Sequence, residues 1–438
     1  MQIKSLSLLA GAALGLSGSL AMAQQSTDEV RAVVSEMMAD AETRSSLLSG
    51  GDAGHDGRFF IAGDGFRLNI GGYIQTRYYM NFRDEGEVGQ PGFGDPQDDF
   101  THGFYMSRVK VDFSGELNKD WFYRVRLGAS SASNPDADSS ESSGVNFDYA
   151  YGGYKFANGM KVTFGQFKLP LLREELIADT KGLAVERSMV NDLFSQGYSQ
   201  GIQFSHEYET WRWCGAFSDG VNSANTNWTS QTNTSGFITS GQAEYALTGR
   251  FEFLFSGAWK QFEDFTSPKG SDFGFMMGAA AHWQQSTQTP VITDNDQNMF
   301  EFTVDASLKG DSWNIYGAFV GRQQDNRAAG VDSDYFDMGA IVQGGWRFAE
   351  NTELFGRWDA VFFDDDRGTN QDSSNFITVG VNQYFAGHAA KATLDLIWAV
   401  EETSELTFTG GVPNTQIGIL GENSSGEVCI RMQLQVVF

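Results

Sequence analysis

Long hydrophobic runs, cysteine and histidine are all scarce in this sequence of 438 residues. Beyond residue 23, no segment approaches the roughly 18 consecutive apolar residues that a membrane-spanning helix needs. The two cysteines, Cys214 and Cys429, are too few for a disulfide framework and lie in different predicted strands, so we expect free thiols. These absences exclude a helical membrane protein and a disulfide-stabilised secreted domain.

The five histidines carry no recognisable catalytic motif. The sequence contains no G-x-S-x-G, no H-E-x-x-H and no paired C-x-x-C. Hydrolases of this kind need a Ser or Asp nucleophile beside a His base. We therefore expect no enzyme, no metal site and no cofactor. The histidines are His55, His102, His206, His282 and His388.

Basic residues are also scarce, since 30 Lys and Arg stand against 56 Asp and Glu and the formal net charge is −26. This balance excludes a nucleic-acid partner, which requires basic patches. Many acids gather in predicted loops, where we expect solvated loop tips, with divalent-cation binding at a cell surface as the alternative. These acids are Asp95, Asp98, Asp99, Asp136, Asp138, Asp294, Asp296, Asp364, Asp365 and Asp366.

The N-terminus predicts a secretory signal peptide, because Lys4 precedes a small and apolar run that ends in the A-x-A site Ala21-Met22-Ala23. Apolar residues at three- and four-residue spacing then predict a short periplasmic helix over 24–48, although the seam is short for a coiled coil. We expect a signal peptide at 1–23, a periplasmic helix and linker at 24–57, and a β-barrel at 58–438.

The last twelve residues alternate between apolar and polar side chains. Successive strand side chains point to opposite faces, so this segment predicts a strand with one continuous apolar face. The edge strand of a soluble sheet would leave that face uncovered, whereas the closing strand of an outer-membrane barrel places it in lipid. The apolar face consists of Val428, Ile430, Met432, Leu434, Val436 and Phe438.

The same alternation recurs along the chain, and we count sixteen strands. Charge on a lipid face costs a few kcal/mol, so the polar faces should point into the lumen. Predicted outer faces include Tyr105, Ser107, Val109, Phe147, Tyr149, Tyr151, Phe255 and Trp259. Predicted inner faces include Met106, Arg108, Lys110, Asp148, Arg250, Glu252 and Lys260. The polar and charged inner faces, with many Gly and Ser, favour a water-filled pore.

Long connections rich in Gly, Asp, Ser and Asn alternate with short turns. The long connections are 84–102, 131–144, 169–197, 219–240, 285–298, 323–334, 364–375 and 401–426. Long loops on one side and short turns on the other are typical of outer-membrane barrels. The predicted fold is all-β: a 16-stranded antiparallel transmembrane β-barrel, wide enough for an aqueous channel, with a short N-terminal periplasmic helix.

Several short segments resemble the phosphate-selective porin O and P family. They are Phe164-Gly165-Gln166-Phe167-Lys168-Leu169-Pro170, Glu186-Arg187-Ser188-Met189, Gly201-Ile202-Gln203-Phe204 and Gly380-Val381-Asn382-Gln383-Tyr384-Phe385. The resemblance covers roughly residues 59–438. It implies a homotrimeric, sixteen-stranded diffusion channel that favours anions and whose third long loop folds inward.

In that family, selectivity is attributed to inward arginines and lysines at and above a constriction. Cations inside a low-dielectric wall concentrate anions, and arginine offers a fork to phosphate oxygens. The residues that fit by inward parity and placement are Arg67, Arg77, Arg108, Lys110, Arg124 and Arg126, with Lys168 and Arg173 at the start of the third long loop. Because acids such as Asp112 and Glu301 are interspersed, pairing of each cation with a neighbouring acid is the alternative.

We therefore expect an outer-membrane porin of a Gram-negative-type bacterium, a passive channel for small hydrophilic solutes that favours anions such as phosphate. Its expected partners are outer-membrane lipid, small anionic or hydrophilic solutes and, from the resemblance, two further copies in a homotrimer. A general porin without anion preference is the main alternative. A barrel enzyme and an adhesin are further alternatives; an adhesin would show a narrow barrel or a lumen plugged by apolar side chains.

Overall fold

The computed structural model describes residues 52–83, 100–129, 145–226, 243–287, 296–328, 331–367, 371–403, 406, 416–421 and 426–438. The predicted signal peptide, the predicted helix at 24–48 and most of the acidic loop tips lie outside these ranges. The chain divides into a small compact unit, residues 1–54 and 61–64, and a large one, residues 55–60 and 65–438. Strands β1 (Asp52–His55) and β2 (Phe59–Gly63) have residues in both units, and β1 falls within the segment predicted as a linker.

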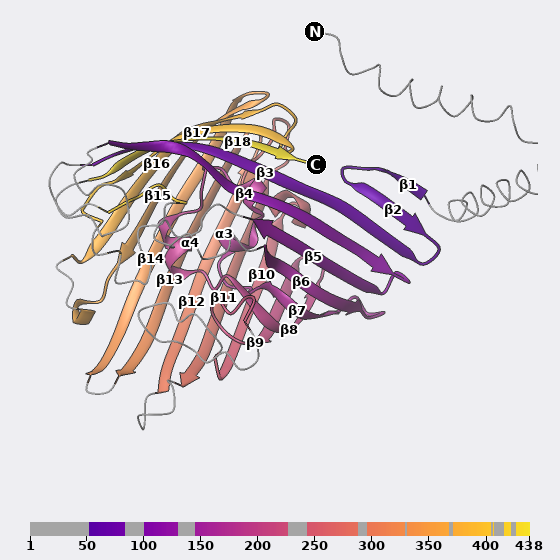
Figure 1. Ribbon diagram of the computed structural model, residues 1–438, viewed down its shortest axis with the longest axis horizontal. Helices are drawn as coiled ribbons and strands as arrows, with labels where there is room; N and C mark the ends of the chain where they lie inside the picture. The colour runs from indigo at the N-terminus through magenta and orange to yellow at the C-terminus, as the bar shows by residue number, and fades with distance from the viewer. Residues whose placement is uncertain are drawn as a thin grey trace, which may run out of the picture. The chain divides into compact units, whose positions relative to one another are not determined.

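Within the described residues, the large unit is a closed barrel of sixteen antiparallel strands, as predicted (Figure 1). Strands that are neighbours in sequence pair with each other, and the C-terminal strand closes the barrel by pairing with the first. The strands are β3 (Phe66–Phe82), β4 (Phe100–Leu117), β5 (Trp121–Ala129), β6 (Asn146–Lys155), β7 (Lys161–Lys168), β8 (Tyr198–Glu207), β9 (Trp211–Ser218), β10 (Tyr245–Ser256), β11 (Gly274–Thr287), β12 (Asp296–Gly310), β13 (Trp313–Ala328), β14 (Val331–Ala349), β15 (Thr352–Phe362), β16 (Ser373–Tyr384), β17 (Ala390–Ala399) and β18 (Val428–Val437).

Most strands place apolar side chains on the outside and polar ones inside. In β10 the exposure alternates at every residue, so that Phe251 is exposed while Arg250 and Glu252 are buried in the lumen. The final strand keeps the predicted facing as well, with Leu434 outside and Arg431 inside. An apolar outer wall around a charged interior is the pattern of a barrel that spans a bilayer. Among the described residues, the helices are all too short or too polar to cross a membrane.

A β-bulge in β4 changes the facing predicted for its first half. Ser107 has no partner on β3, because the register shifts by one residue there. The prediction that Tyr105 faces outward is therefore wrong: it pairs with Arg77 and its ring lies against that of Tyr79. Met106 is exposed on the outer face instead. A bulge inserts one residue and reverses the alternation without any signal in the composition.

A second bulge lies in β6 at Asp148, where the register to β5 shifts. Tyr149 and Tyr151, predicted to face outward, consequently face the lumen and pack beside the buried Phe167. The Tyr149 ring lies under the Arg124 guanidinium, with 4.3 Å from Cζ to the ring centroid. Both tyrosines therefore belong to the wall of the passage and not to the lipid face.

Two predicted boundaries are wrong. Residues 323–334 were expected to be a long loop, but β13 and β14 continue to Ala328 and Val331. These strand ends carry mostly polar residues, which gives them the composition of a loop. β10 stops at Ser256 and Gly257 turns the chain at a φ of +92°, so Trp259 and Lys260 do not continue that strand. They lie in the short helix η2 (Trp259–Phe262). A further short helix, η3 (Asp365–Arg367), follows β15.

Candidate functional site

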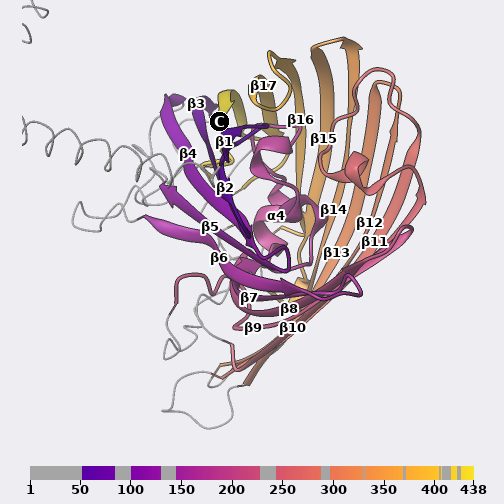
Figure 2. The ribbon, with the colours of Figure 1, turned by 90° about the vertical axis from the view of Figure 1, so that its right-hand side faces the viewer.

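The connection between β7 and β8, residues 169–197, folds into the barrel (Figure 2), as predicted for the third long loop. We call it the inner loop. It contains α3 (Arg173–Leu176), η1 (Asp179–Lys181) and α4 (Met189–Phe194). Ser188 begins α4 by accepting a 2.9 Å hydrogen bond from the Asn191 amide, a standard N-cap. α4 then packs against β14 and β15.

The inner loop and the wall formed by β13–β18 share one buried apolar cluster. The expectation of polar and charged inner faces is therefore wrong on this side. Loop members are Leu172, Ile177, Leu183, Met189, Val190, Leu193 and Phe194. Wall members are Tyr316, Val320, Ile341, Phe355, Val361, Phe376, Ile397, Ala399 and Cys429. At Gly339 the loop comes so close that a Cβ would lie 2.6 Å from Val190 Cγ1. A glycine there is required by this close approach.

Two further segments enter the same side of the lumen. Phe265, in the connection 257–273, joins the apolar cluster, and Asp264 beside it accepts a 2.5 Å hydrogen bond from Lys309 Nζ. From the last long connection, Ile417 and Ile419 also join the cluster. These two segments and the inner loop fill the lumen next to β13–β18.

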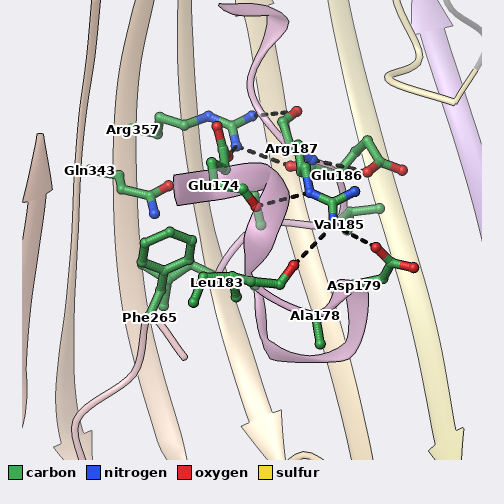
Figure 3. A pocket seen from close by; sticks show the side chains of 13 residues that line it. Glu174, Ala178, Asp179, Leu183, Val185, Glu186, Arg187, Phe265, Gln343 and Arg357 are labelled. Carbon is green, nitrogen blue, oxygen red and sulfur yellow. Dashed lines mark hydrogen bonds and ion pairs between the residues drawn. The ribbon is translucent and has the colours of Figure 1, made fainter. Parts of the chain in front are cut away.

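Ion pairs tie the inner loop to β3 and β4, the strands that follow β18 around the wall. Glu186 lies 2.9 Å from Arg77 Nη1 and 2.8 Å from Arg108 Nη2. Within the loop, Arg187 Nη2 lies 2.5 Å from Asp179 Oδ1 and its guanidinium also contacts backbone carbonyls (Figure 3). Figure 3 also shows Arg357, which donates to the carbonyl of Glu186 from the β15 side. The loop is thus held from both walls.

Electrostatics fixes the charge state of these loop acids. Burial by itself raises the pKa of Asp179, but Arg187, Lys168 and Arg108 outweigh it and hold the pKa well below its usual range. Burial also raises the pKa of Glu186, but Arg108, Arg77 and Arg187 outweigh it and lower the pKa. Both carboxylates are therefore ionised at neutral pH, and the loop stays charge-paired.

The first group of predicted anion-binding residues lies on β3–β5, facing the lumen. Arg77 and Arg108 hold Glu186, as described above. Lys110 Nζ lies 2.5 Å from Asp148 Oδ2, at the bulge in β6. Arg124 and Arg126 share one acid on β4: Asp112 Oδ2 accepts from both, at 2.6 Å and 2.8 Å. Every cation in this group thus has an acidic partner.

The other three predicted residues divide between the loop and the barrel end. Lys168 Nζ lies 2.6 Å from Glu175 Oε1 at the root of the inner loop. Arg173 is buried and donates to Ser307 Oγ, which fastens α3 to β12. Arg67 lies apart from the rest, half exposed and paired with Asp56 at 2.6 Å. The structure therefore brings seven of the eight residues to the inner loop or the wall around it and leaves Arg67 outside; that they bind anions stays a prediction.

Within the described residues, we distinguish two cavities on the side of the lumen enclosed by β4–β10. One has a volume of about 490 Å³ and lies next to the short turns; we call it the turn-side cavity. Its charged lining consists of Lys155, Lys161, Lys168, Arg212, Arg250, Glu207 and Glu252. The other, the loop-side cavity, measures about 360 Å³, and its charged lining consists of Arg108, Arg187, Glu175, Glu186 and Asp192.

Sequence reasoning missed Lys155 and Lys161, although a signal for them existed. The Asn158-Gly159 turn was identified, and residues that flank a tight turn pair across the hairpin. The structure pairs Lys155 with Lys161, and both side chains are exposed to the cavity. Like charges directly opposite one another are destabilising, so this pair favours a nearby anion.

A family model described as phosphate-selective porin O and P matches residues 81–416. The chain belongs to this family. No curated protein sequence matches the chain significantly. Within the described residues, no group of three or more His, Cys, Asp or Glu side chains is placed to hold a metal ion.

Solved porins share the fold at low sequence identity. OmpT of Vibrio cholerae superposes with a TM-score of 0.54 at 12% identity, covering 86% of this chain and all of that one. An anion-selective porin from Comamonas acidovorans gives 0.55 at 11% identity, covering 85% and 100%. Salmonella typhi OmpF in complex with daunomycin gives 0.55 at 10% identity, covering 86% and 99%. The family and this architecture make the chain an outer-membrane porin channel.

Proposed function

We propose that this porin lets small hydrophilic anions, phosphate among them, diffuse through the bacterial outer membrane along the β4–β10 side of its lumen. The observation that carries the proposal is the turn-side cavity, in which five basic side chains face two acidic ones. A basic cavity with low-dielectric walls raises the local anion concentration and repels cations. The apolar filling beside β13–β18 confines solutes to this basic side.

The main competing function is a general porin without anion preference. It is favoured by the ion pairing of the predicted cations, since Arg77, Arg108, Arg124 and Arg126 each have a carboxylate partner. A paired arginine contributes little net field at a distance. The turn-side cavity favours anions nevertheless, because Lys155 and Lys161 have no ion-pair partner among the described residues.

A structural barrel or adhesin would have its lumen closed by apolar side chains. The β13–β18 side of this lumen is filled in that way, but both cavities on the other side are lined by charged and polar groups. That lining supports passage of hydrated solutes. An enzymatic role is not part of the proposal, because the family is one of channels.

We also propose a homotrimer. An apolar groove of about 770 Å³ runs along the outer wall around the closing strand, between β3, β4 and β16–β18. Its lining includes Phe104, which is 84% exposed, and Leu434. A neighbouring copy would cover such a surface. Chemical cross-linking of the detergent-purified protein should give a trimer band, and a monomer alone would contradict this part.

The test of the solute class is the reversal potential in planar bilayers under a salt gradient, with phosphate titrated against the chloride current. The wild-type pore should prefer anions and be blocked by phosphate. Lys155→Gln combined with Lys161→Gln should lose part of both properties. The matched control is Lys119→Gln with Lys269→Gln, which removes two charges at exposed turns outside the cavity. Cation preference without phosphate block in the wild type would refute the proposal.

A further inference from the structure

One ion pair stands between the two cavities. Lys168 lines the turn-side cavity, and Glu175 lines the loop-side cavity. Their charged atoms, Lys168 Nζ and Glu175 Oε1, lie 2.6 Å apart. Both residues are more than nine-tenths buried. A solute that moves from one cavity to the other along this side therefore has to pass the pair.

We infer that Glu175 is a specificity-determining residue: its carboxylate occupies the anion site of Lys168 and has to be displaced by each solute that binds there. The inference rests on the proposed anion passage and names the class of anion that wins this competition. A carboxylate already holds the ammonium group, so a weak monovalent ion such as chloride gains little by replacing it. A divalent oxyanion such as hydrogen phosphate brings more charge and more acceptor oxygens.

The surroundings of Glu175 allow the displacement without leaving a buried charge alone. Its Oε2 already accepts a 3.0 Å hydrogen bond from Asn191 Nδ2 and lies 3.5 Å from Arg187 Nε. A released carboxylate can rotate fully onto these two groups. A buried charge that keeps a cationic partner avoids the large cost of an uncompensated one.

Lys168 also keeps its place when the carboxylate leaves. Its Nζ donates a 2.7 Å hydrogen bond to the backbone carbonyl of Glu175, which does not depend on that side chain. The ring of Tyr198 lies 5.3 Å from the same nitrogen. The ammonium group is thus positioned by the backbone, the ring and the more distant carboxylate of Asp179, 3.9 Å away, and the Glu175 side chain is the part that exchanges with solute.

The neighbouring Glu174 provides a matched control. It lies on the same short helix and carries the same charge, but its carboxylate contacts Ser188 and Arg357 and not Lys168. It accepts from the Ser188 amide at 3.0 Å and lies 3.5 Å from Arg357 Nη1. Glu174 lines neither of the two cavities.

The experiment compares Glu175→Gln, Glu174→Gln, Lys168→Gln and the double variant Lys168→Gln with Glu175→Gln in bilayers. The readouts are the chloride-to-potassium permeability ratio and the phosphate concentration that halves the chloride current. Removing one unit charge at contact distance should lower that concentration about tenfold in Glu175→Gln. Glu174→Gln, which removes the same charge without a contact to Lys168, should leave it within about twofold of wild type. Lys168→Gln and the double variant should lose the block alike, because the competitor matters only while Lys168 is present.

Equal phosphate block in Glu175→Gln and Glu174→Gln, in a pore that otherwise prefers anions, would overturn the inference and leave the proposed function standing. A wild-type pore without anion preference that gains it in Glu175→Gln would support the inference and refute the proposed function. If Glu175→Gln does not insert into the bilayer, Glu175→Asp is used instead, because its side chain is one methylene shorter and its charge lies farther from Lys168. On a logarithmic scale, it should strengthen the phosphate block by about half as much as expected for Glu175→Gln. No change in that variant would equally overturn the inference.

Discussion

Removal of the charge on Glu186 should release the inner loop from the β3–β4 wall. Its carboxylate lies within 3 Å of two guanidinium groups, those of Arg77 and Arg108, and only 8% of the side chain is exposed. Breaking a buried pair by removing one partner costs about 3–5 kcal/mol. Glutamine keeps the shape and one acceptor oxygen, so Glu186→Gln should cost about 3 kcal/mol, the lower end of that range. The population of the released loop should then rise about a hundredfold.

Hydrogen exchange followed by mass spectrometry measures this release directly. The Val185 amide donates to Asp395 Oδ2 at 2.9 Å, and the Met189 amide donates to Asp359 Oδ2 at 2.8 Å. Both hydrogen bonds join the loop to the wall, so both amides should exchange about a hundredfold faster in Glu186→Gln. The fluctuations of the open-channel current should grow in parallel.

The control is Glu263→Gln, which breaks an exposed ion pair of this loop, to Lys181 at 3.2 Å. The Glu263 side chain is 60% exposed, and exposed pairs contribute at most about 1 kcal/mol. Equal exchange rates in Glu186→Gln and Glu263→Gln would refute the reasoning that the buried pair holds the loop. The pH dependence gives a second check, because a lowered pKa means that the contribution is present above the usual carboxyl pKa and is lost only as pH falls through the lowered value.

Three further outcomes are expected. Gly339→Val should push α4 off the wall, because even a Cβ lies 2.6 Å from Val190 Cγ1, and should lower the melting temperature more than Gly356→Val, where the nearest atom is 3.9 Å away. Asp395→Asn should lower the unfolding free energy in urea by about 3–5 kcal/mol, because its pair with Arg431 at 2.7 Å is fully buried. Burial raises the pKa of Asp264, but His388 and Lys309 outweigh it and lower the pKa to about 2. Protease resistance of the 257–273 connection should therefore persist at pH 5 and fall between about pH 4 and pH 2.

The strands could be predicted because alternate residues face lipid and the lumen, which favour apolar and polar side chains respectively. β10 and β18 follow that rule at nearly every position, and their facing was predicted correctly. The bulges at Ser107 and Asp148 could not be predicted, since one inserted residue changes the facing but not the composition. The extended ends of β13 and β14 were missed because they carry few apolar residues.

The filling of the lumen could not be predicted for a different reason. Ile397 is buried inside the barrel, yet it lies between Leu396 and Trp398 and so reads as part of an ordinary apolar run. Pairing partners were equally hidden, because Glu186 is separated from Arg77 by 109 residues. The sequence indicated which side chains face inward, but not which of them neutralise one another.

The one-sided filling of the barrel separates two quantities that are often treated as one. Strand number fixes the circumference of the wall, whereas within the described residues the bore is narrowed by three peptide segments that take no part in strand pairing. Changing the sequence of these segments should therefore alter the size and charge of the solutes that cross, while the strand pairing of the barrel stays the same. A graft of a different inner loop onto the same β7 and β8 ends should yield a pore of new permeability in an unchanged shell. The strands thus determine the size of the barrel, and the segments inside the lumen determine which solutes pass.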